Sequence, residues 1–170
     1  NGVAAVNGCM NFDGVDDLVL VPNFDRQLFS FSAWINKEDG GFITPALISS
    51  NNQGWGLGFG TGQGTTANGV SGPQPLLFTH TAVDYVNSTQ YIAPGTFRHV
   101  AVTYNGSTAT FYIDGVLDSS KSYARIFNSQ GANYGLGGSL KGKMDDVRIY
   151  DRILTAAEIG QLSQIAPSCA

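Results

Sequence analysis

The most informative stretch of the chain is GKMDDVRIYDRILTAAEI, residues 142–159. Val147 and Ile149 alternate with polar neighbours, which predicts a strand with one buried face and one face in water. Thr155 and Glu158 stand three residues apart, as in the capping box that begins many helices. We therefore expect a closing strand that completes a sheet, followed by a short helix that plugs one end. The apolar residues expected to pin this helix to the body are Leu154, Ile159 and Leu162.

The rest of the chain consists of many short apolar runs separated by turn signals. Asn105-Gly106 lies between two such runs, and Asn-Gly is a strong β-hairpin signal. Many short strands with one terminal helix predict an all-β sandwich. The expected strands include 18–21, 28–35, 55–59, 84–86, 98–104, 109–113 and 116–117. Within 28–35, Phe29, Phe31, Ala33 and Ile35 share one face, and Leu28, Ser30, Ser32 and Trp34 share the other.

Four segments, in this order along the chain, resemble laminin-G-like, pentraxin-like and concanavalin A-like jelly-roll domains. They are FDGVDD at 12–17, FSFSAWI at 29–35, FRHVAVTY at 97–104 with FYIDG at 111–115, and the stretch 142–159. The resemblance implies one jelly-roll domain, residues 1–170, with two antiparallel sheets and one short C-terminal helix. Because this fold carries lectins, adhesion modules, enzymes and inert spacers, the resemblance is poorly specific for function.

Composition narrows the classes of partner. The chain has 9 basic and 13 acidic residues, for a net charge of -4, and it shows no basic patch. Nucleic acid is therefore not an expected partner. No apolar run approaches the roughly 20 residues that cross a bilayer, so membrane insertion is not expected either.

The two cysteines, Cys9 and Cys169, lie near opposite ends of the chain. They could be two unrelated free thiols. Because the termini of jelly-roll domains usually lie side by side, the resemblance implies instead a disulfide that ties the first strand to the tail. Such a bond would place the protein in an oxidising compartment, so we expect it to be secreted or on a cell surface.

The catalytic patterns known for this fold are absent from the sequence. Retaining glycoside hydrolases need two carboxylates roughly 5 Å apart, and the related hydrolases carry a Glu-x-Asp-x-(x)-Glu run along one strand. Only two glutamates occur, Glu38 in a predicted loop and Glu158 in the helix cap. His80 and His99 are expected on polar sheet surfaces. We therefore do not expect an enzyme, and a diverged polysaccharide-active enzyme is the least favoured alternative.

A structural calcium ion is the expected cofactor. Asp13, Asp16 and Asp17 crowd one turn, where their carboxylates repel one another unless a cation or solvent relieves them. Calcium prefers six to eight oxygen ligands. The resemblance implies that Asp145 joins this cluster if the first and last strands are neighbours. The alternative is a solvated acidic turn without an ion.

A carbohydrate or a glycosylated surface is the expected partner, and a protein partner in a structural or adhesion role is the alternative. Aromatic faces would stack on sugars, beside polar side chains that bind hydroxyl groups. The preferred candidates are Trp55, Asn68, His80 and Tyr85. Further candidates are Tyr91, Tyr134, Asn51, Asn52, Gln53 and Asn133. The alternative for Trp55 is a core residue with Leu57 and Phe59, and Trp34 is expected in the core.

Overall fold

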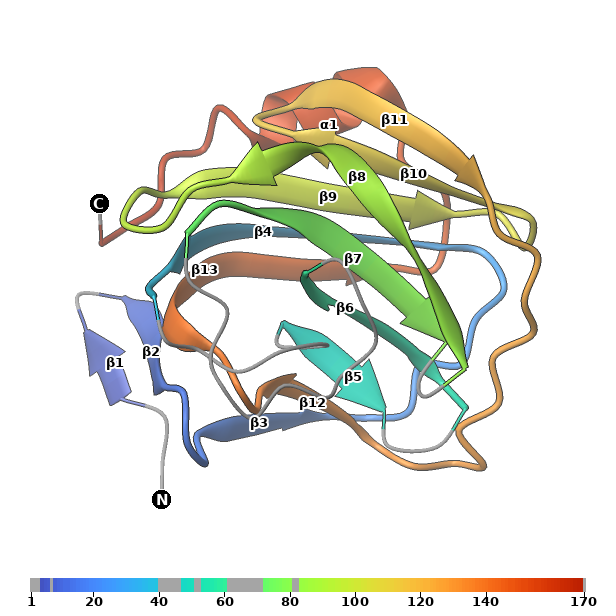
Figure 1. The fold of residues 1–170 in the computed structure, drawn as a ribbon, viewed down its shortest axis with the longest axis horizontal. Helices are drawn as coiled ribbons and strands as arrows, with labels where there is room; N and C mark the ends of the chain where they lie inside the picture. Colours follow the sequence, from blue (N-terminus) through green and yellow to red (C-terminus); the bar gives the residue numbers. More distant parts are fainter. Residues whose placement is uncertain are drawn as a thin grey trace.

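The computed structural model describes residues 4–6, 8–39, 47–50, 53–60, 72–80 and 83–169. In this part of the chain, two antiparallel sheets pack face to face and one short helix lies outside them (Figure 1). The seven-stranded sheet has the spatial order β1 (Ala4–Val6), β2 (Cys9–Asp13), β13 (Lys141–Tyr150), β4 (Phe29–Lys37), β9 (Arg98–Tyr104), β10 (Thr108–Ile113), β11 (Val116–Ser122). The six-stranded sheet has the order β3 (Leu18–Val21), β12 (Tyr134–Gly137), β5 (Ile48–Ser50), β6 (Trp55–Phe59), β7 (Gln74–His80), β8 (Asp84–Ile92). The helix α1 spans Ala156–Leu162, and the predicted jelly-roll sandwich is confirmed.

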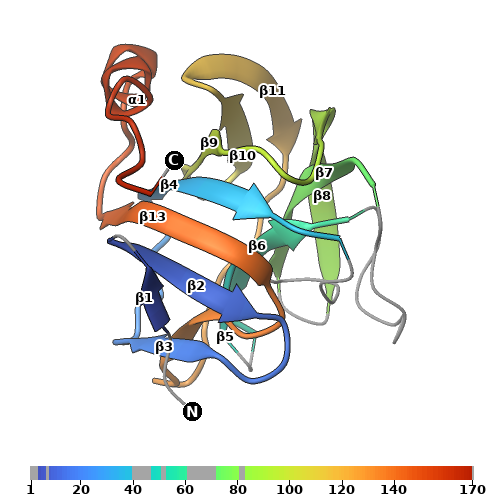
Figure 2. The ribbon, with the colours of Figure 1, turned by 90° about the vertical axis from the view of Figure 1, so that its left-hand side faces the viewer.

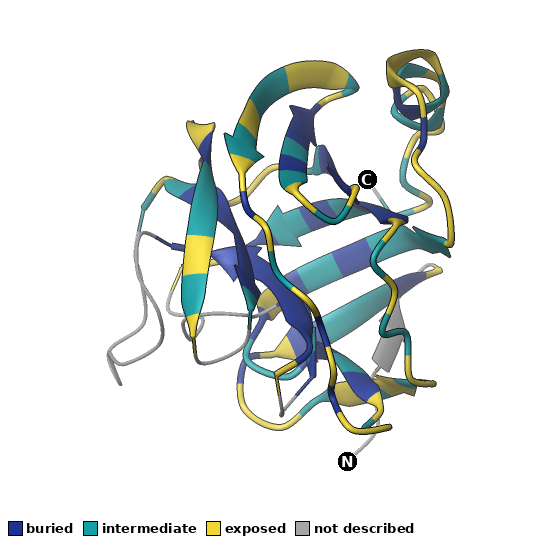
Figure 3. Ribbon diagram, turned by 90° about the vertical axis from the view of Figure 1, so that its right-hand side faces the viewer, coloured by how far each residue is buried: buried dark blue, intermediate teal, exposed yellow. Residues whose placement is uncertain are grey.

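The core lies between the two sheets and comes from alternating apolar residues. On β4, the predicted inner face is fully buried, and its Phe29 ring stacks on Trp55 of β6 with ring centroids 4.5 Å apart. Phe78 of β7 and Tyr104 of β9 extend this aromatic cluster, with centroids 5.4 Å apart. Buried residues are accordingly concentrated in the middle strands of both sheets (Figure 3).

The closing strand β13 lies inside the seven-stranded sheet, between β2 and β4 (Figure 2). Its pairing with β4 shifts register between Asp145 and Arg148, where Asp146 has a φ of 48°. Val147 and Ile149 pack against the core, as the alternating pattern predicts. The C-terminal part of the chain therefore completes the sheet from within.

The helix α1 packs on the outer face of the seven-stranded sheet, so the expectation that it plugs one end of the sandwich is wrong. Leu154 and Ile159 form a small second core with Ala101 of β9 and Tyr112 of β10. Ser30 of β4 accepts a hydrogen bond from the Leu154 backbone and donates one to the Arg152 carbonyl, so the chain turns over β4 directly after β13. The predicted capping box is present. In the described part of the chain, no helix has the length and apolar character needed to cross a membrane.

The two sheets are joined along one side, where β8 and β11 are neighbouring edge strands (Figure 1). The Asp118 carboxylate of β11 accepts hydrogen bonds from the backbone N–H groups of Thr89, at 2.6 Å, and Gln90, at 2.8 Å. These N–H groups belong to the bulged part of β8, where the pairing with β7 shifts register. One carboxylate thus fixes the position of the β8 edge.

Candidate functional site

Two tyrosines lie on the outer face of the β7–β8 hairpin. The inner face of β7 contributes to the core, so Pro75 and Thr79 point away from it. Tyr91 lies opposite Pro75 and Tyr85 lies opposite Thr79, and directly opposed residues of an antiparallel pair project on the same side. The two side chains are 56% and 37% exposed. Because Pro75 and Thr79 are four residues apart, the tyrosines are separated by about 13 Å along the strand.

A hydrogen-bond network around Asp84 fixes the end of β7 against the start of β8. The Tyr123 hydroxyl donates to the Asp84 carboxylate at 2.6 Å and accepts from the His80 backbone N–H at 2.6 Å. Arg125 forms an ion pair with the same carboxylate. Burial raises the pKa of Tyr123, so its hydroxyl keeps its proton and acts as a structural donor. The network positions the β8 strand that carries Tyr85.

His80 and Tyr85 are not brought together. His80 follows the inner face of β7, whereas Tyr85 projects from the outer face of β8. The His80 Nε2 atom lies 3.0 Å from the Gln53 carbonyl oxygen, and the ring contacts Phe127 with centroids 5.7 Å apart. His80 thus belongs to the end of the core.

Trp55 is fully buried, so its prediction as a ligand-stacking residue is wrong and its alternative as a core residue holds. Its indole nitrogen donates to the Phe24 carbonyl at 3.0 Å, and both faces lie among aromatic rings. Tyr134 is also buried, and its hydroxyl donates to Asp25 at 2.7 Å. Both side chains follow the inner face of their strands. Of the other predicted polar partners, Gln53 and Asn133 are exposed, and Asn51, Asn52 and Asn68 lie outside the described residues.

The acidic turn after β2 brings three carboxylates together. One oxygen from each of Asp13, Asp16 and Asp17 lies within 4.8 Å of the others. Asp13 accepts a hydrogen bond from the Val15 backbone at 2.8 Å, and Asp17 accepts one from the Asp13 backbone at 3.0 Å. These bonds hold the carboxylates in one turn. Each of them uses one carboxylate oxygen, of Asp13 or of Asp17, and the second oxygen of that carboxylate takes no part in it. An exposed set of hard oxygen donors fits a calcium ion.

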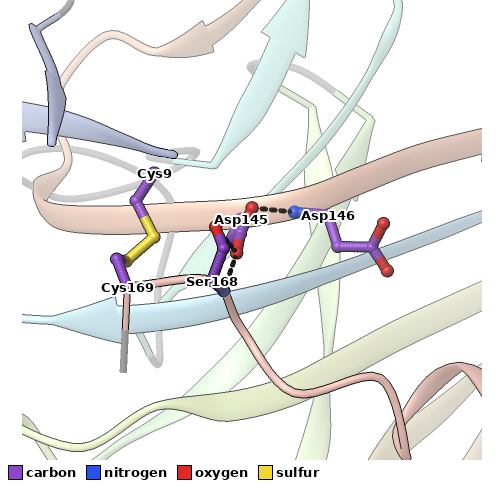
Figure 4. The surroundings of a disulfide bond; sticks show 5 residues. All are labelled: Cys9, Asp145, Asp146, Ser168 and Cys169. Carbon is purple, nitrogen blue, oxygen red and sulfur yellow. Dashed lines mark hydrogen bonds between the residues drawn. A yellow bond between two sulfur atoms is a disulfide. The ribbon is translucent and has the colours of Figure 1, made fainter. Parts of the chain in front are cut away.

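Asp145 does not join this turn, so the prediction that it does is wrong. The strands β2 and β13 are neighbours as expected, but Asp13 pairs with Lys141, which is four residues from Asp145, or about 13 Å. Asp145 instead accepts hydrogen bonds from the backbone N–H and hydroxyl of Ser168, at 2.5 and 2.8 Å (Figure 4). Burial raises the pKa of Asp145, but these hydrogen bonds outweigh it and lower the pKa.

A disulfide bond joins Cys9 and Cys169 next to this contact (Figure 4). The two Cα atoms are 5.8 Å apart, and no free cysteine is present. The bond ties the end of the chain to β2, close to the Asp145–Ser168 hydrogen bonds. The tail is therefore held by one covalent bond and by two bonds to one carboxylate.

A polar cluster lies on the outer face of the seven-stranded sheet, and the sequence predicted only the place of His99 in it. Trp34 of β4, predicted as a core residue, packs edge to face against His99 of β9, with centroids 5.5 Å apart. Four buried side-chain atoms here lack a hydrogen-bond partner among the described residues: Ser32 Oγ, Trp34 Nε1, Asn36 Oδ1 and His99 Nδ1. The signal was present in the sequence, because the alternation of residues 28–35 places Trp34 on the same face as two serines.

His99 is an uncharged base at neutral pH. Its side chain is 1% exposed, and burial lowers its pKa to about 4, although Asp114 and Asp146 favour the charged form. An imidazole in this state has one N–H donor and one acceptor nitrogen. The polar cluster thus carries no net charge of its own.

The two glutamates of the chain have structural roles. Glu158 completes the capping box and forms an ion pair with Arg152 at 2.6 Å, while Glu38 lies 3.8 Å from Lys141. Glu38 follows β4 and lies beside the start of β13, whereas Glu158 lies in α1, beyond the end of β13. They therefore do not form the close carboxylate pair of a retaining glycosidase.

Comparison with protein families identifies the chain. Residues 13–160 match the family model described as the concanavalin A-like lectin/glucanases superfamily. This protein belongs to the concanavalin A-like lectin/glucanase superfamily. No curated protein matches the sequence.

Solved structures with a similar fold support this architecture. Domain 4 of AbnA, an extracellular GH43 arabinanase from Geobacillus stearothermophilus solved with arabinotriose, is 20% identical, with a TM-score of 0.73 over 95% of this chain and 81% of that chain. The heptameric SAP-like pentraxin of Limulus polyphemus is 15% identical, with a TM-score of 0.62 over 90% and 80% of the two chains. The CBM40 of the Ruminococcus gnavus IT-sialidase, bound to α2,3-sialyllactose, is 11% identical, with a TM-score of 0.58 over 81% and 83%. These likenesses, all below 25% identity, show the fold of this superfamily member.

Proposed function

We propose that this protein is a non-catalytic carbohydrate-binding module of one domain, and that the outer face of the β7–β8 hairpin binds the glycan. The observation that carries the proposal is the pair of exposed tyrosines, Tyr85 and Tyr91, on one face of this hairpin. Aromatic rings at a surface offer apolar faces for sugar C–H groups and hydroxyls for hydrogen bonds. The complexes of similar folds with arabinotriose and sialyllactose support a saccharide as the ligand class.

Hydrogen bonds from other parts of the chain hold the hairpin in place before any ligand binds. The Asn87 amide donates to the carbonyls of Gly60, at 2.6 Å, and Leu76, at 3.2 Å, and Asp118 holds the β8 edge. A rigid platform loses little conformational entropy on binding, which favours affinity. Since the rings stand about 13 Å apart along the strand, a ligand must span several sugar units to contact both. We therefore expect oligosaccharides to bind more tightly than monosaccharides.

The test is glycan binding by single and double alanine variants. Tyr85→Ala and Tyr91→Ala should each weaken oligosaccharide binding about tenfold, the equivalent of about 1.4 kcal/mol. Leu117→Ala is the matched control, because Leu117 is an equally exposed apolar residue on the neighbouring strand β11. A double tyrosine variant that binds every glycan as tightly as the unmodified protein would rule out this binding face.

We propose that the acidic turn binds a structural calcium ion. Asp13, Asp16 and Asp17 would supply carboxylate oxygens, and the ion would relieve their mutual repulsion. Calcium should raise the melting temperature of the protein, and a chelator should reverse the shift. The shift should be lost in Asp16→Asn with Asp17→Asn and kept in Asp151→Asn, an exposed acid elsewhere. Equal melting temperatures with calcium and with chelator would contradict this site.

We also propose that the protein is extracellular. The Cys9–Cys169 disulfide supports this location, because such bonds persist in oxidising compartments. Protein recovered from the medium of its source should therefore resist thiol alkylation until it is reduced. Recovery only from the cell interior, with both thiols reactive, would refute this location.

A further inference from the structure

The buried polar cluster on the outer face of the seven-stranded sheet is a costly arrangement for a structural surface. Ser32 and His99 are each 1% exposed, yet Ser32 Oγ and His99 Nδ1 have no hydrogen-bond partner among the described residues. Trp34 Nε1 and Asn36 Oδ1, on the same face of β4, also have no hydrogen-bond partner among the described residues. Each unsatisfied buried group typically costs about 1–3 kcal/mol. Four such atoms on neighbouring strands indicate a partner outside the described residues.

The segment after α1, residues 163–169, is anchored at two points on this sheet, and we call it the C-terminal strap. At one end, Ser163 lies so close to Gly115 that a Cβ atom added to this glycine would collide with the serine side chain. At the other end, Ser168 donates two hydrogen bonds to Asp145. Gly115 follows β10 and Asp145 belongs to β13, so β9 and β4 lie between the two anchor points.

The distance between the anchors leaves the strap one short path. Three strand spacings amount to about 14 Å, and five extended residues reach at most about 18 Å. Asp145 pairs with Trp34, and Trp34 pairs with His99, so these positions form one row across the sheet between the anchors. The strap therefore runs over Trp34 and His99, without a hydrogen bond to any of the four unsatisfied atoms.

The chemistry of the cluster selects a neutral hydroxylated ligand. The Trp34 indole can only donate and the Asn36 carbonyl oxygen can only accept, while the Ser32 hydroxyl can do both. A metal cation could not accept the hydrogen bond from the indole, and a fully deprotonated anion could not donate to the amide oxygen. A hydroxyl group does both, and His99 is uncharged at neutral pH.

We propose that Ser32, Trp34, Asn36 and His99 form a second binding site, for a single neutral sugar unit, and that the C-terminal strap is its disulfide-fastened cover. The site lies on the sheet opposite to the β7–β8 hairpin and does not depend on it. The sugar enters when the strap is displaced, and the Cys9–Cys169 bond limits this displacement. Reduction of the disulfide is therefore expected to increase the apparent affinity.

The test uses the two indole N–H resonances of the ¹⁵N-labelled protein. Trp34 Nε1 has no partner among the described residues, whereas Trp55 Nε1 donates to Phe24 inside the core and serves as an internal control. D-glucose, D-galactose and L-arabinose are added one at a time to the disulfide-bonded protein and to the Cys9→Ser/Cys169→Ser variant. At least one sugar should shift the Trp34 resonance saturably, with at least tenfold tighter binding to the variant, and leave the Trp55 resonance unchanged.

Further variants test the sugar site and the covering strap separately. All titrations are repeated with Tyr85→Ala and Tyr91→Ala, which remove the binding face proposed on the hairpin and should not change the Trp34 shift. Ser32→Ala should weaken sugar binding, measured from the Trp34 shift, about tenfold. If the cysteine variant fails to fold, Pro167→Gly loosens the strap with the disulfide intact and should tighten binding in the same direction.

Two results would overturn the proposal. The absence of a saturable Trp34 shift with all three sugars, in both forms of the protein, would mean that only water satisfies the cluster. Equal affinities in the disulfide-bonded, cysteine-free and Pro167→Gly proteins would mean that the strap is not a cover.

Discussion

His99 is the residue whose protonation most directly opposes folding. Its pKa is lowered by burial to about 4, whereas an exposed histidine has a pKa of about 6.5. Between these pH values the unfolded chain binds a proton that the folded chain does not bind. Stability is therefore complete above about pH 6.5 and falls as the pH is lowered towards 4.

We predict that the His99→Gln variant loses this part of the pH dependence. The difference in unfolding free energy between pH 7 and pH 4 should be smaller in the variant by an amount on the order of 3 kcal/mol. Urea unfolding at a series of pH values measures it, and the carboxylates contribute equally to both proteins. Parallel profiles for the two proteins would show that His99 titrates normally.

Tyr134 is the second residue that we expect to control stability. Its hydroxyl donates to Asp25 and accepts from the Trp55 backbone N–H at 3.2 Å. Tyr134→Phe should therefore lower the unfolding free energy by about 2 kcal/mol, because the buried Trp55 N–H loses its acceptor and the half-buried Asp25 loses one of its donors. Tyr91→Phe, at an exposed site, should change it by less than about 0.5 kcal/mol. A similar effect of both substitutions in urea unfolding would contradict this role.

At the level of single elements, the contact between β8 and β11 depends on Asp118. Asp118→Ala removes the acceptor for the N–H groups of Thr89 and Gln90. We expect these two amide protons to exchange with solvent at least tenfold faster, while the amides of β9 are unaffected. Ser122→Ala, on the same strand, is the control. Unchanged exchange at Thr89 and Gln90 would show that the carboxylate does not hold this edge.

Strand positions followed from the sequence wherever a strand has an apolar face. The predicted ranges 18–21, 55–59 and 98–104 coincide with β3, β6 and β9. The strands β8 and β11 extend well beyond the predicted 84–86 and 116–117, because their remaining residues are mostly polar and lie at sheet edges. In these polar parts, hydrogen bonds to a neighbouring strand define the strand. The pattern of apolar residues within one segment cannot predict such bonds.

The candidate sites were predicted less well because they depend on which face of a strand meets which neighbour. Period-two alternation separates the two faces of β4 but does not reveal that the segment after β13 covers the second face, so Trp34 was assigned to the wrong environment. Asp145 illustrates the role of register. The neighbouring strands were predicted correctly, yet an offset of four residues separates this carboxylate from the acidic turn.

For the whole molecule, the disulfide closes nearly the entire chain. The two cysteines are 160 residues apart in sequence, so the bond restricts the unfolded ensemble strongly. Cys9→Ser with Cys169→Ser should lower the unfolding free energy by up to about 5 kcal/mol in the chain-entropy model. Guanidinium unfolding with and without reductant provides the measurement. A reductant effect that persists in the double variant would point to a cause other than this bond.

The position of β13 has a consequence for protein synthesis. On the ribosome, β2 and β4 emerge early, but the strand that joins them is translated only at residues 141–150. Until then the nascent chain carries two strand edges that await the same partner, and such edges readily pair with other chains. The seven-stranded sheet can therefore be completed only after residues 141–150 have been translated, so its folding waits for the strand that comes last in the sequence.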